Sequence, residues 1–131
     1  MAKAKVITVS FTSTDGVGSV YKTMKLTKRK LANLFRAAAQ NLDNMPQMWC
    51  KGKLQAVSRN DCEQFCALGM INKIAGVRNE YNELTGAAQK AFRKANNQEI
   101  MTVNDTADNV SQVTKLMRRA AAFLDHGGSF E

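Results

Sequence analysis

Residues 108–125 read DNVSQVTKLMRRAAAFLD and carry the clearest periodic pattern in the chain. Apolar side chains recur there at helical spacing, at Val110, Val113, Met117, Ala120 and Leu124. Gly127 follows as a stop signal. We therefore predict a long amphipathic helix over Asp108–Asp125 that presents one apolar face to a helical core.

Three more helices are expected upstream. Thr27 is suited to cap a helix that runs to about Asn41, whose apolar face holds Leu31, Leu34, Phe35, Ala38 and Leu42. Ser58 and Asp61 resemble a capping box that opens a second helix, through about Ala75 to a stop at Gly76, with one stripe formed by Cys62, Cys66, Met70 and Ile74. A third helix over about Glu80–Ala95 places together Tyr81, Leu84, Ala88, Ala91 and Phe92, and Asn96-Asn97 closes it.

The first 26 residues predict a β-hairpin. Apolar and polar residues alternate over Lys5–Thr12 and again over Val20–Leu26, and Asp15-Gly16 between them is typical of a hairpin turn. Two strands alone are marginal in water, so the hairpin must pack on helices or pair with a second copy. Farther on, Ile100–Val103 is short enough for a strand or an extended connector, and Asn104-Asp105-Thr106 has turn and cap chemistry.

The chain is therefore expected to be a single α+β domain: an N-terminal β-hairpin followed by a four-helix, mostly α domain. Its length of 131 residues suits one compact domain. We divide it into a basic hairpin extension (1–26), a helical domain (27–125) and a short tail (126–131).

The positive charge is concentrated in the first half. Residues 1–60 hold eleven Lys and Arg against two acids, a net of +9, whereas residues 61–131 hold eight against nine, a net of −1, which together give the total of +8. Such a field favours an anionic partner. The candidate contact residues for nucleic-acid phosphates or an acidic protein surface are Lys3, Lys5, Lys22, Lys25, Lys28, Arg29, Lys30 and Arg36. The alternative is that these cations only solvate an exposed helix and strand edge.

Other features narrow the classes of function. No apolar run is long enough for a membrane span and no signal-peptide core is present, so we expect a soluble, cytoplasmic protein that does not bind membranes. Three cysteines at low density indicate reduced thiols. A zinc site would need Cys50, Cys62, Cys66 and His126 to converge without the usual close pairing, so neither a metal nor a cofactor is predicted.

Three sets of residues have two interpretations each. Cys66 with Asn104 or Asp105, and with the single histidine His126, could form a hydrolase centre, but a core cysteine and a histidine that interacts with the last carbonyls of its helix explain the same residues. Trp49 is either a core anchor or part of a pocket or interface. Asn104 and Asp105 either cap a helix or hold the Trp49 loop by hydrogen bonds.

Three short motifs follow one another along the chain: Trp49-Cys50-Lys51-Gly52, Cys66-Ala67-Leu68-Gly69, and Asn104-Asp105 before the last helix. Their order resembles a family of small bacterial and phage domains of unknown function, and the resemblance covers about Leu31–Leu124. It implies that the shared framework consists of Trp49, Cys66, Gly69, Asn104 and Asp105. The hairpin and most of the basic residues lie outside it.

The sequence thus favours a non-enzymatic binding protein whose basic first half engages nucleic acid, a nucleotide-like ligand or an acidic protein surface. By analogy with small basic phage proteins, we expect an accessory protein or an inhibitor directed at a host or defence component, acting in the host cytoplasm. The alternatives are a cysteine-dependent enzyme built on Cys66, and a structural protein that forms a homo-oligomer through the hairpin edges.

Overall fold

A computed structural model describes residues 5–12, 19–57, 63–77 and 81–131. The described residues form two small antiparallel sheets and five α-helices, so the α+β class and the N-terminal hairpin are confirmed, whereas the expected number of four helices is wrong. The elements in chain order are β1 (Lys5–Thr12), β2 (Ser19–Leu26), α1 (Lys28–Asn44), the 3-10 helix η1 (Pro46–Met48), β3 (Gln55–Val57), β4 (Glu63–Phe65), α2 (Ala67–Ala75), α3 (Glu83–Asn96), α4 (Ile100–Thr106) and α5 (Val110–Asp125).

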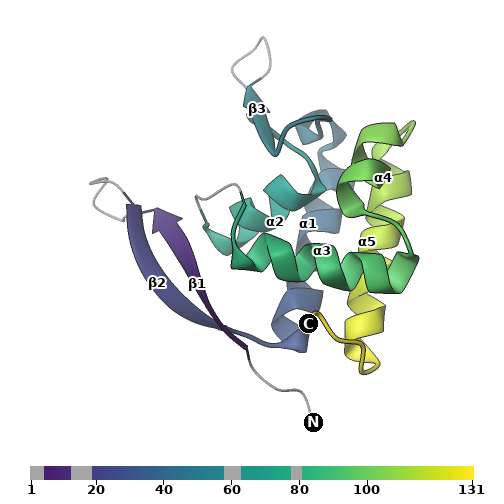
Figure 1. Ribbon diagram of the computed structural model, residues 1–131. Helices are drawn as coiled ribbons and strands as arrows, with labels where there is room; N and C mark the ends of the chain where they lie inside the picture. The colour runs from purple at the N-terminus through teal and green to yellow at the C-terminus, as the bar shows by residue number, and fades with distance from the viewer. Residues whose placement is uncertain (1–4, 13–18, 58–62, 78–80) are drawn as a thin grey trace.

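The hairpin β1–β2 packs one face on the helices, as its alternation predicts. Ile7 and Leu26 are buried, whereas the neighbouring Val6 and Lys25 point to solvent. The Thr8 N–H donates to Glu83 Oε1 at the start of α3 (3.2 Å), which ties the hairpin to the helical body. Beyond this contact the hairpin reaches away from the helices (Figure 1).

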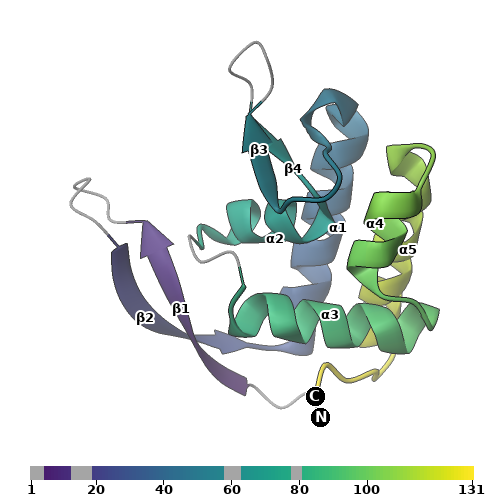
Figure 2. The ribbon, with the colours of Figure 1, turned by 45° about the horizontal axis from the view of Figure 1, so that its top comes forward.

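Helices α1 and α5 form the centre of the domain and run antiparallel. Lys28 at the start of α1 contacts Gly127 just after α5, while Asp43 near the end of α1 contacts Arg118 of α5. The core side chains between them include Leu31, Phe35, Ala38, Leu42, Val113, Met117, Ala120 and Leu124, all buried as the helical spacing predicts. Figure 2 shows α3 crossing this pair and α4 lying beside α5.

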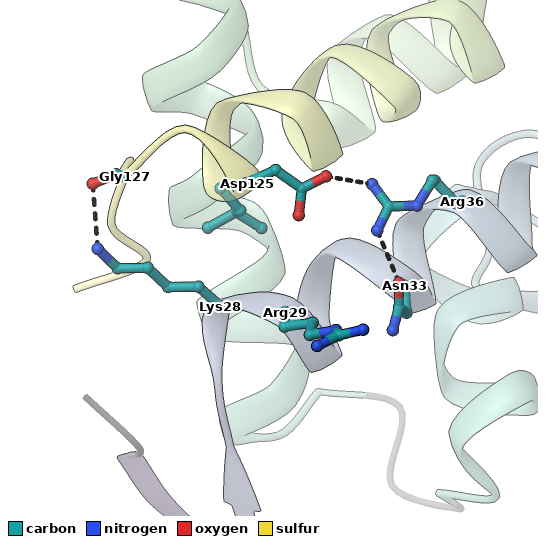
Figure 3. Close-up of a pocket in the computed structure, with 7 residues that line it drawn as sticks. Lys28, Arg29, Asn33, Arg36, Asp125 and Gly127 are labelled. Atoms are coloured by element: carbon teal, nitrogen blue, oxygen red, sulfur yellow. Dashed lines mark hydrogen bonds and ion pairs between the residues drawn. The ribbon is translucent and has the colours of Figure 1, made fainter. Parts of the chain in front are cut away.

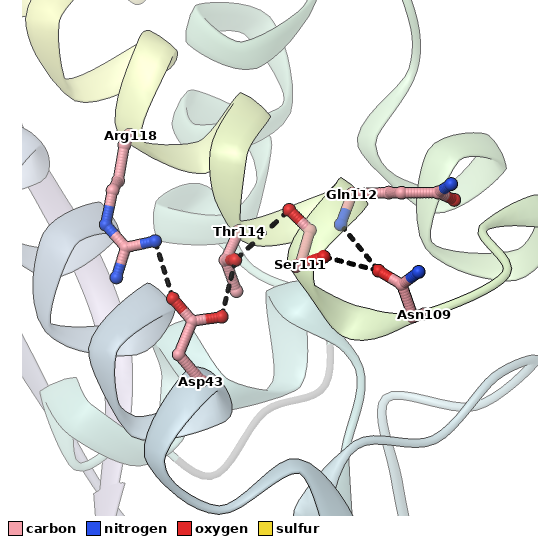
Figure 4. A network of polar contacts seen from close by, with 6 residues as sticks. All are labelled: Asp43, Asn109, Ser111, Gln112, Thr114 and Arg118. Carbon is pink, nitrogen blue, oxygen red and sulfur yellow. Dashed lines mark hydrogen bonds and ion pairs between the residues drawn. The ribbon is translucent and has the colours of Figure 1, made fainter.

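A polar network joins the far end of α1 to α5 (Figure 4). Asp43 accepts a hydrogen bond from Thr114 Oγ1 (2.6 Å) and pairs with Arg118 (2.6 Å). Nearby, Asn109 caps α5 by accepting from the N–H of Gln112 (3.3 Å). The start of α5 is thus fixed to α1 by side chains, and the helix begins two residues later than predicted.

The second predicted helix is wrong in its first half. Glu63–Phe65 is a strand that pairs with β3, and α2 begins only at Ala67. Cys66 has extended backbone angles (φ −75°, ψ 179°), and its Sγ accepts a hydrogen bond from the Gly69 N–H, so it caps the helix instead of lying inside it. Ile74 is 36% exposed and does not continue a buried stripe. Ser58, Asp61 and Cys62, on which the capping box and stripe also depended, lie outside the described residues.

Helix α3 also starts later than expected. Asn82 and Thr85 form a reciprocal capping box, which fixes the first helical residue at Glu83. Tyr81 precedes the cap and is 63% exposed, so its assignment to the buried face is wrong. The predicted closure is confirmed, because Asn97 ends the helix in the left-handed conformation (φ 55°).

The segment after α3 is a fifth helix, not a strand or connector. Ile100 and Val103 of α4 lie one turn apart and are both buried, which favours a helix on the surface of the core. Asn104 and Asp105 therefore belong to this helix and do not cap α5, whose cap is Asn109.

The C-terminal segment folds back on the domain. His126 Nδ1 lies 2.7 Å from the Ala122 carbonyl oxygen, which is the predicted interaction with the end of its helix. Phe130 is buried in the same core as the helices, and Lys94 Nζ donates to Ser129 Oγ (2.7 Å). None of the described helices has the length and apolar character that a membrane crossing requires.

Candidate functional site

The first turn of α1 carries an unusual concentration of positive charge. Thr27 caps the helix by accepting from the Lys30 N–H (3.0 Å), as predicted, and the turn that follows contains Lys28, Arg29 and Lys30 with no acidic residue. A helix N-terminus already carries a partial positive charge, so cations in the first turn are unfavourable for folding and favourable for an external anion.

Three of the predicted cations meet in one depression, which we call the basic hollow (Figure 3). It has a volume of about 560 Å³ between α1 and the end of α5, and its lining residues are Lys28, Arg29, Asn33, Arg36, Leu124, Asp125 and Gly127. The lining contains three cations, Lys28, Arg29 and Arg36, and one carboxylate, that of Asp125, which pairs with Arg36, so it keeps a net positive charge.

Two of these cations are fixed in place. Arg36 pairs with Asp125 (2.6 Å) and donates to Asn33 Oδ1 (2.6 Å), and Lys28 Nζ donates to the Gly127 carbonyl oxygen (3.0 Å). Arg29 is exposed and its side chain has no hydrogen-bond or ion-pair partner within the described part of the chain. The hollow therefore combines anchored cations with one guanidinium that is free to bind.

The other predicted contact residues are not among the lining residues of the basic hollow. Lys25 is exposed at the end of β2, and Lys30 Nζ donates to its carbonyl oxygen (3.3 Å), so Lys25 lies beside the first turn of α1, to which Lys30 belongs. Lys5 and Lys22 belong to β1 and β2, but their side chains are outside the description, as is Lys3 altogether.

Sequence reasoning missed Asn33, Asp125 and Gly127. The spacing of Arg29, Asn33 and Arg36 along a predicted helix would have indicated Asn33, since residues four and three apart share a face. The other two come from the far end of the chain. Only the antiparallel packing of α1 on α5 brings them to the hollow.

The residues of the expected framework lie together in a second site, centred on Asn104. This side chain is fully buried. Its Oδ1 accepts hydrogen bonds from Trp49 Nε1 (2.8 Å) and the Ala67 N–H (3.0 Å), and its Nδ2 donates to the Cys50 carbonyl oxygen (3.0 Å). Asn104 thus connects the Trp49 loop, the start of α2 and helix α4, in agreement with the hydrogen-bonding alternative.

Asp105 and Gly69 complete this connection. Asp105 Oδ1 accepts from the Gly52 N–H (2.8 Å), where Gly52 has a positive φ of 79° that favours glycine. Gly69 lies against the Leu54 backbone so closely that a Cβ atom there would be 1.8 Å from the Leu54 oxygen. The loop between η1 and β3 is therefore fixed at both ends by groups from α2 and α4.

Trp49 has features of both predicted roles. Its ring is half-buried against the core, its indole N–H is bonded to Asn104, and Lys51 Nζ lies 5.4 Å from the ring centroid on an exposed loop. It is thus an anchor at the edge of the core.

The Cys66 thiol is buried and therefore shielded from solvent. Burial raises its pKa to about 11, and its sulfur lies 3.4 Å from the Gly69 nitrogen and 3.9 Å from Met101 Sδ. Asn104 bonds to other groups, and the His126 ring is bonded to Ala122 at the end of α5. A protonated, inaccessible thiol is a poor nucleophile, so this geometry does not favour the cysteine hydrolase.

The cysteines show no metal-ligand grouping in the described ranges. No set of three His, Cys, Asp or Glu side chains gathers there. Cys62, one of the four residues considered for zinc, lies outside these ranges. Burial and then the negative charge of Asp105 raise the pKa of the half-buried Cys50, against the effect of Lys53.

Comparison with known proteins identifies one family. No curated protein and no solved structure matches the chain. Residues 26–123, however, match the "Family of unknown function (DUF6197)". The match contains Trp49, Cys66, Gly69, Asn104 and Asp105, begins at the last residue of β2, and excludes most of the hairpin, as expected. It also contains Lys28, Arg29, Lys30 and Arg36, so the expectation that most of the basic residues lie outside the shared region is wrong: four of the eight candidate contact residues lie inside it. This three-quarter coverage shows that the chain belongs to the DUF6197 family of unknown function.

Proposed function

We propose that this protein is a non-enzymatic binding protein that engages an anionic partner through the basic hollow and the first turn of α1. The observation that carries the proposal is that Lys28, Arg29 and Arg36 line one depression beside the positive end of a helix. Arg29 has no partner in the described part of the chain.

The electrostatics support an anion over a purely structural role. Each cation in the first turn of a helix opposes the helix dipole by about 0.3–1 kcal/mol. The first turn holds Lys28, Arg29 and Lys30 with no acidic residue to offset this cost, whereas an anion beside the turn would interact favourably with these charges and with the helix dipole. A guanidinium has five N–H donors, of which Asp125 and Asn33 engage two in Arg36, so it can still contact a ligand.

Nucleic-acid phosphates and carboxylates of an acidic protein both match this chemistry. The role of a phage accessory protein or host- and defence-directed inhibitor rests on chain size and charge and stays a prediction. The same holds for a homo-oligomer through the hairpin edges, which a measurement of molecular mass in solution tests.

The test compares two triple variants that remove the same charge. The site variant is Lys28→Ala with Arg29→Ala and Lys30→Ala, and the control variant replaces Lys90, Lys115 and Arg119, which are exposed on α3 and α5. Fluorescence anisotropy measures binding of labelled single-stranded DNA, duplex DNA, RNA and polyglutamate from low to physiological salt.

We expect at least one of these polyanions to bind with an affinity that falls with salt. The site variant should lose affinity strongly and, if the ligand is single-stranded nucleic acid, reduce the logarithmic salt slope by about 2, because each lost phosphate contact removes about 0.7. No binding to any polyanion at low salt, or an equal loss in the control variant, would refute the proposal.

A further inference from the structure

A second depression lies directly beside the basic hollow, on the α2 side of α1. We call it the apolar hollow. It has a volume of about 420 Å³ and is lined by Thr27, Arg29, Lys30, Asn33, Leu34, Ala37 and Ile74. Ile74 leaves 36% of its surface exposed there, although it belongs to a helix that is otherwise largely buried.

The two hollows share Arg29 and Asn33, which lie one helical turn apart on α1. These side chains form a ridge. On one side of the ridge lie Lys28 and Arg36 with the end of α5, and on the other lie Leu34 and Ile74. A ligand that crosses α1 therefore meets positive charge and apolar surface within one side-chain length of each other.

This combination distinguishes between the two kinds of anionic partner. A nucleic-acid strand binds without sequence preference through phosphates and through base stacking on aromatic side chains. Among the described residues, no aromatic side chain lines either hollow. An acidic protein segment can supply both carboxylates for the cations and an aliphatic side chain for the apolar hollow. Apolar anchors that enter pockets with a charged rim are common in peptide recognition.

We propose that the partner is an acidic protein segment that lies across α1, with a carboxylate at the basic hollow and one aliphatic side chain in the apolar hollow. This inference rests on the proposed function, since the basic hollow supplies its electrostatic half. Arg29 serves both halves, because its guanidinium reaches the carboxylate and its aliphatic stem borders the apolar surface.

The test selects binders from a displayed random library of 12-residue peptides and measures the synthesised winners by anisotropy. We expect acidic sequences with an aliphatic residue. Their affinity should fall about tenfold in Ile74→Ser, because an apolar contact of that size is lost, and should be unchanged in Met45→Ser, which alters an exposed methionine outside both hollows. Replacement of the peptide's aliphatic residue by serine should have the same effect as Ile74→Ser.

A second variant keeps the test decisive if Ile74→Ser alters the fold. Ala37→Glu is at a half-buried position of α1, keeps good helix propensity and places a carboxylate in the apolar hollow. It should weaken the acidic peptide at least as strongly, while circular dichroism shows an unchanged fold.

The outcomes separate this inference from the proposed function. If the affinity of acidic peptides falls in the Lys28, Arg29 and Lys30 triple variant but not in Ile74→Ser or Ala37→Glu, the inference is overturned and the proposed function stands. Binding of single-stranded DNA with no acidic peptide selected would have the same consequence. If neither peptides nor any polyanion bind, the proposed function falls as well.

Discussion

Replacement of Asn104 by alanine tests whether this one side chain holds the Trp49 loop, the start of α2 and helix α4 together. The side chain is fully buried, and its removal leaves the Trp49 indole N–H, the Ala67 N–H and the Cys50 carbonyl without their partner. A buried group that loses its hydrogen bond costs about 1–3 kcal/mol. Because two of the three contacts are only partly buried and water can reach them, we expect the free energy of unfolding to fall by about 4 kcal/mol.

Urea unfolding followed by circular dichroism and by fluorescence measures this loss. The chain has one tryptophan, so the emission of Trp49 reports directly on the loop that Asn104 holds. Asn109→Ala is the matched control, because it removes the same side chain from an exposed helix cap with a bond to the Gln112 N–H, at a cost of about 1 kcal/mol. If Asn104→Ala were no more destabilising than this control, the central role of Asn104 would be wrong.

Four other predictions test separate features. Gly69→Ala should destabilise by about 3 kcal/mol or more in urea unfolding, because the new Cβ would overlap the Leu54 carbonyl oxygen and the backbone cannot move without loss of the loop contacts. Labelling of Cys66 by iodoacetamide, followed by mass spectrometry, should require unfolding, whereas the half-exposed Cys50 should react in the folded protein; equal rates would contradict this. Since burial raises the pKa of Cys66 from 9.0 to about 11, the unfolded chain loses its thiol proton first as the pH rises, so stability should fall between these values, less steeply in Cys66→Ala than in Cys50→Ala. Asp43→Ala, which removes both side-chain contacts to α5, should cost about 1–2 kcal/mol by thermal unfolding, and a value near zero would show that the pair is only a surface contact.

The periodic parts of the fold were predictable because their burial follows from local spacing. On the core faces of α1 and α5 the predicted residues are buried, as are Ile7 and Leu26 of the hairpin, with the exception of Leu34, which is only half-buried. The errors fall where tertiary contacts override local signals. α2 begins at Ala67 because Phe65 pairs with β3 and Cys66 caps the helix, and cysteine is not among the residues that local preference marks as caps. α4 is too short to reveal its helical period.

The features of the two sites also divide into those that the sequence predicted and those that only tertiary contacts established. The excess of positive charge and the position of Lys28, Arg29 and Lys30 at a helix start were properties of the sequence alone. The presence of Asn104 and Asp105 beside the Trp49 loop was one of two open alternatives, and the contacts with Ala67, Cys50 and Gly52 decided it.

The sequence by itself determined where charge and apolar faces lie along each element, since these follow from residue type and from the period of a helix or strand. Only the tertiary structure decided which cations act together. Antiparallel packing of α1 on α5 brings Asp125 and Gly127 to Lys28 and Arg36, and the position of α2 brings Ile74 to the other side of the same helix. Both contacts join residues far apart in the chain, and the local pattern of neither segment contains information about its neighbour in space.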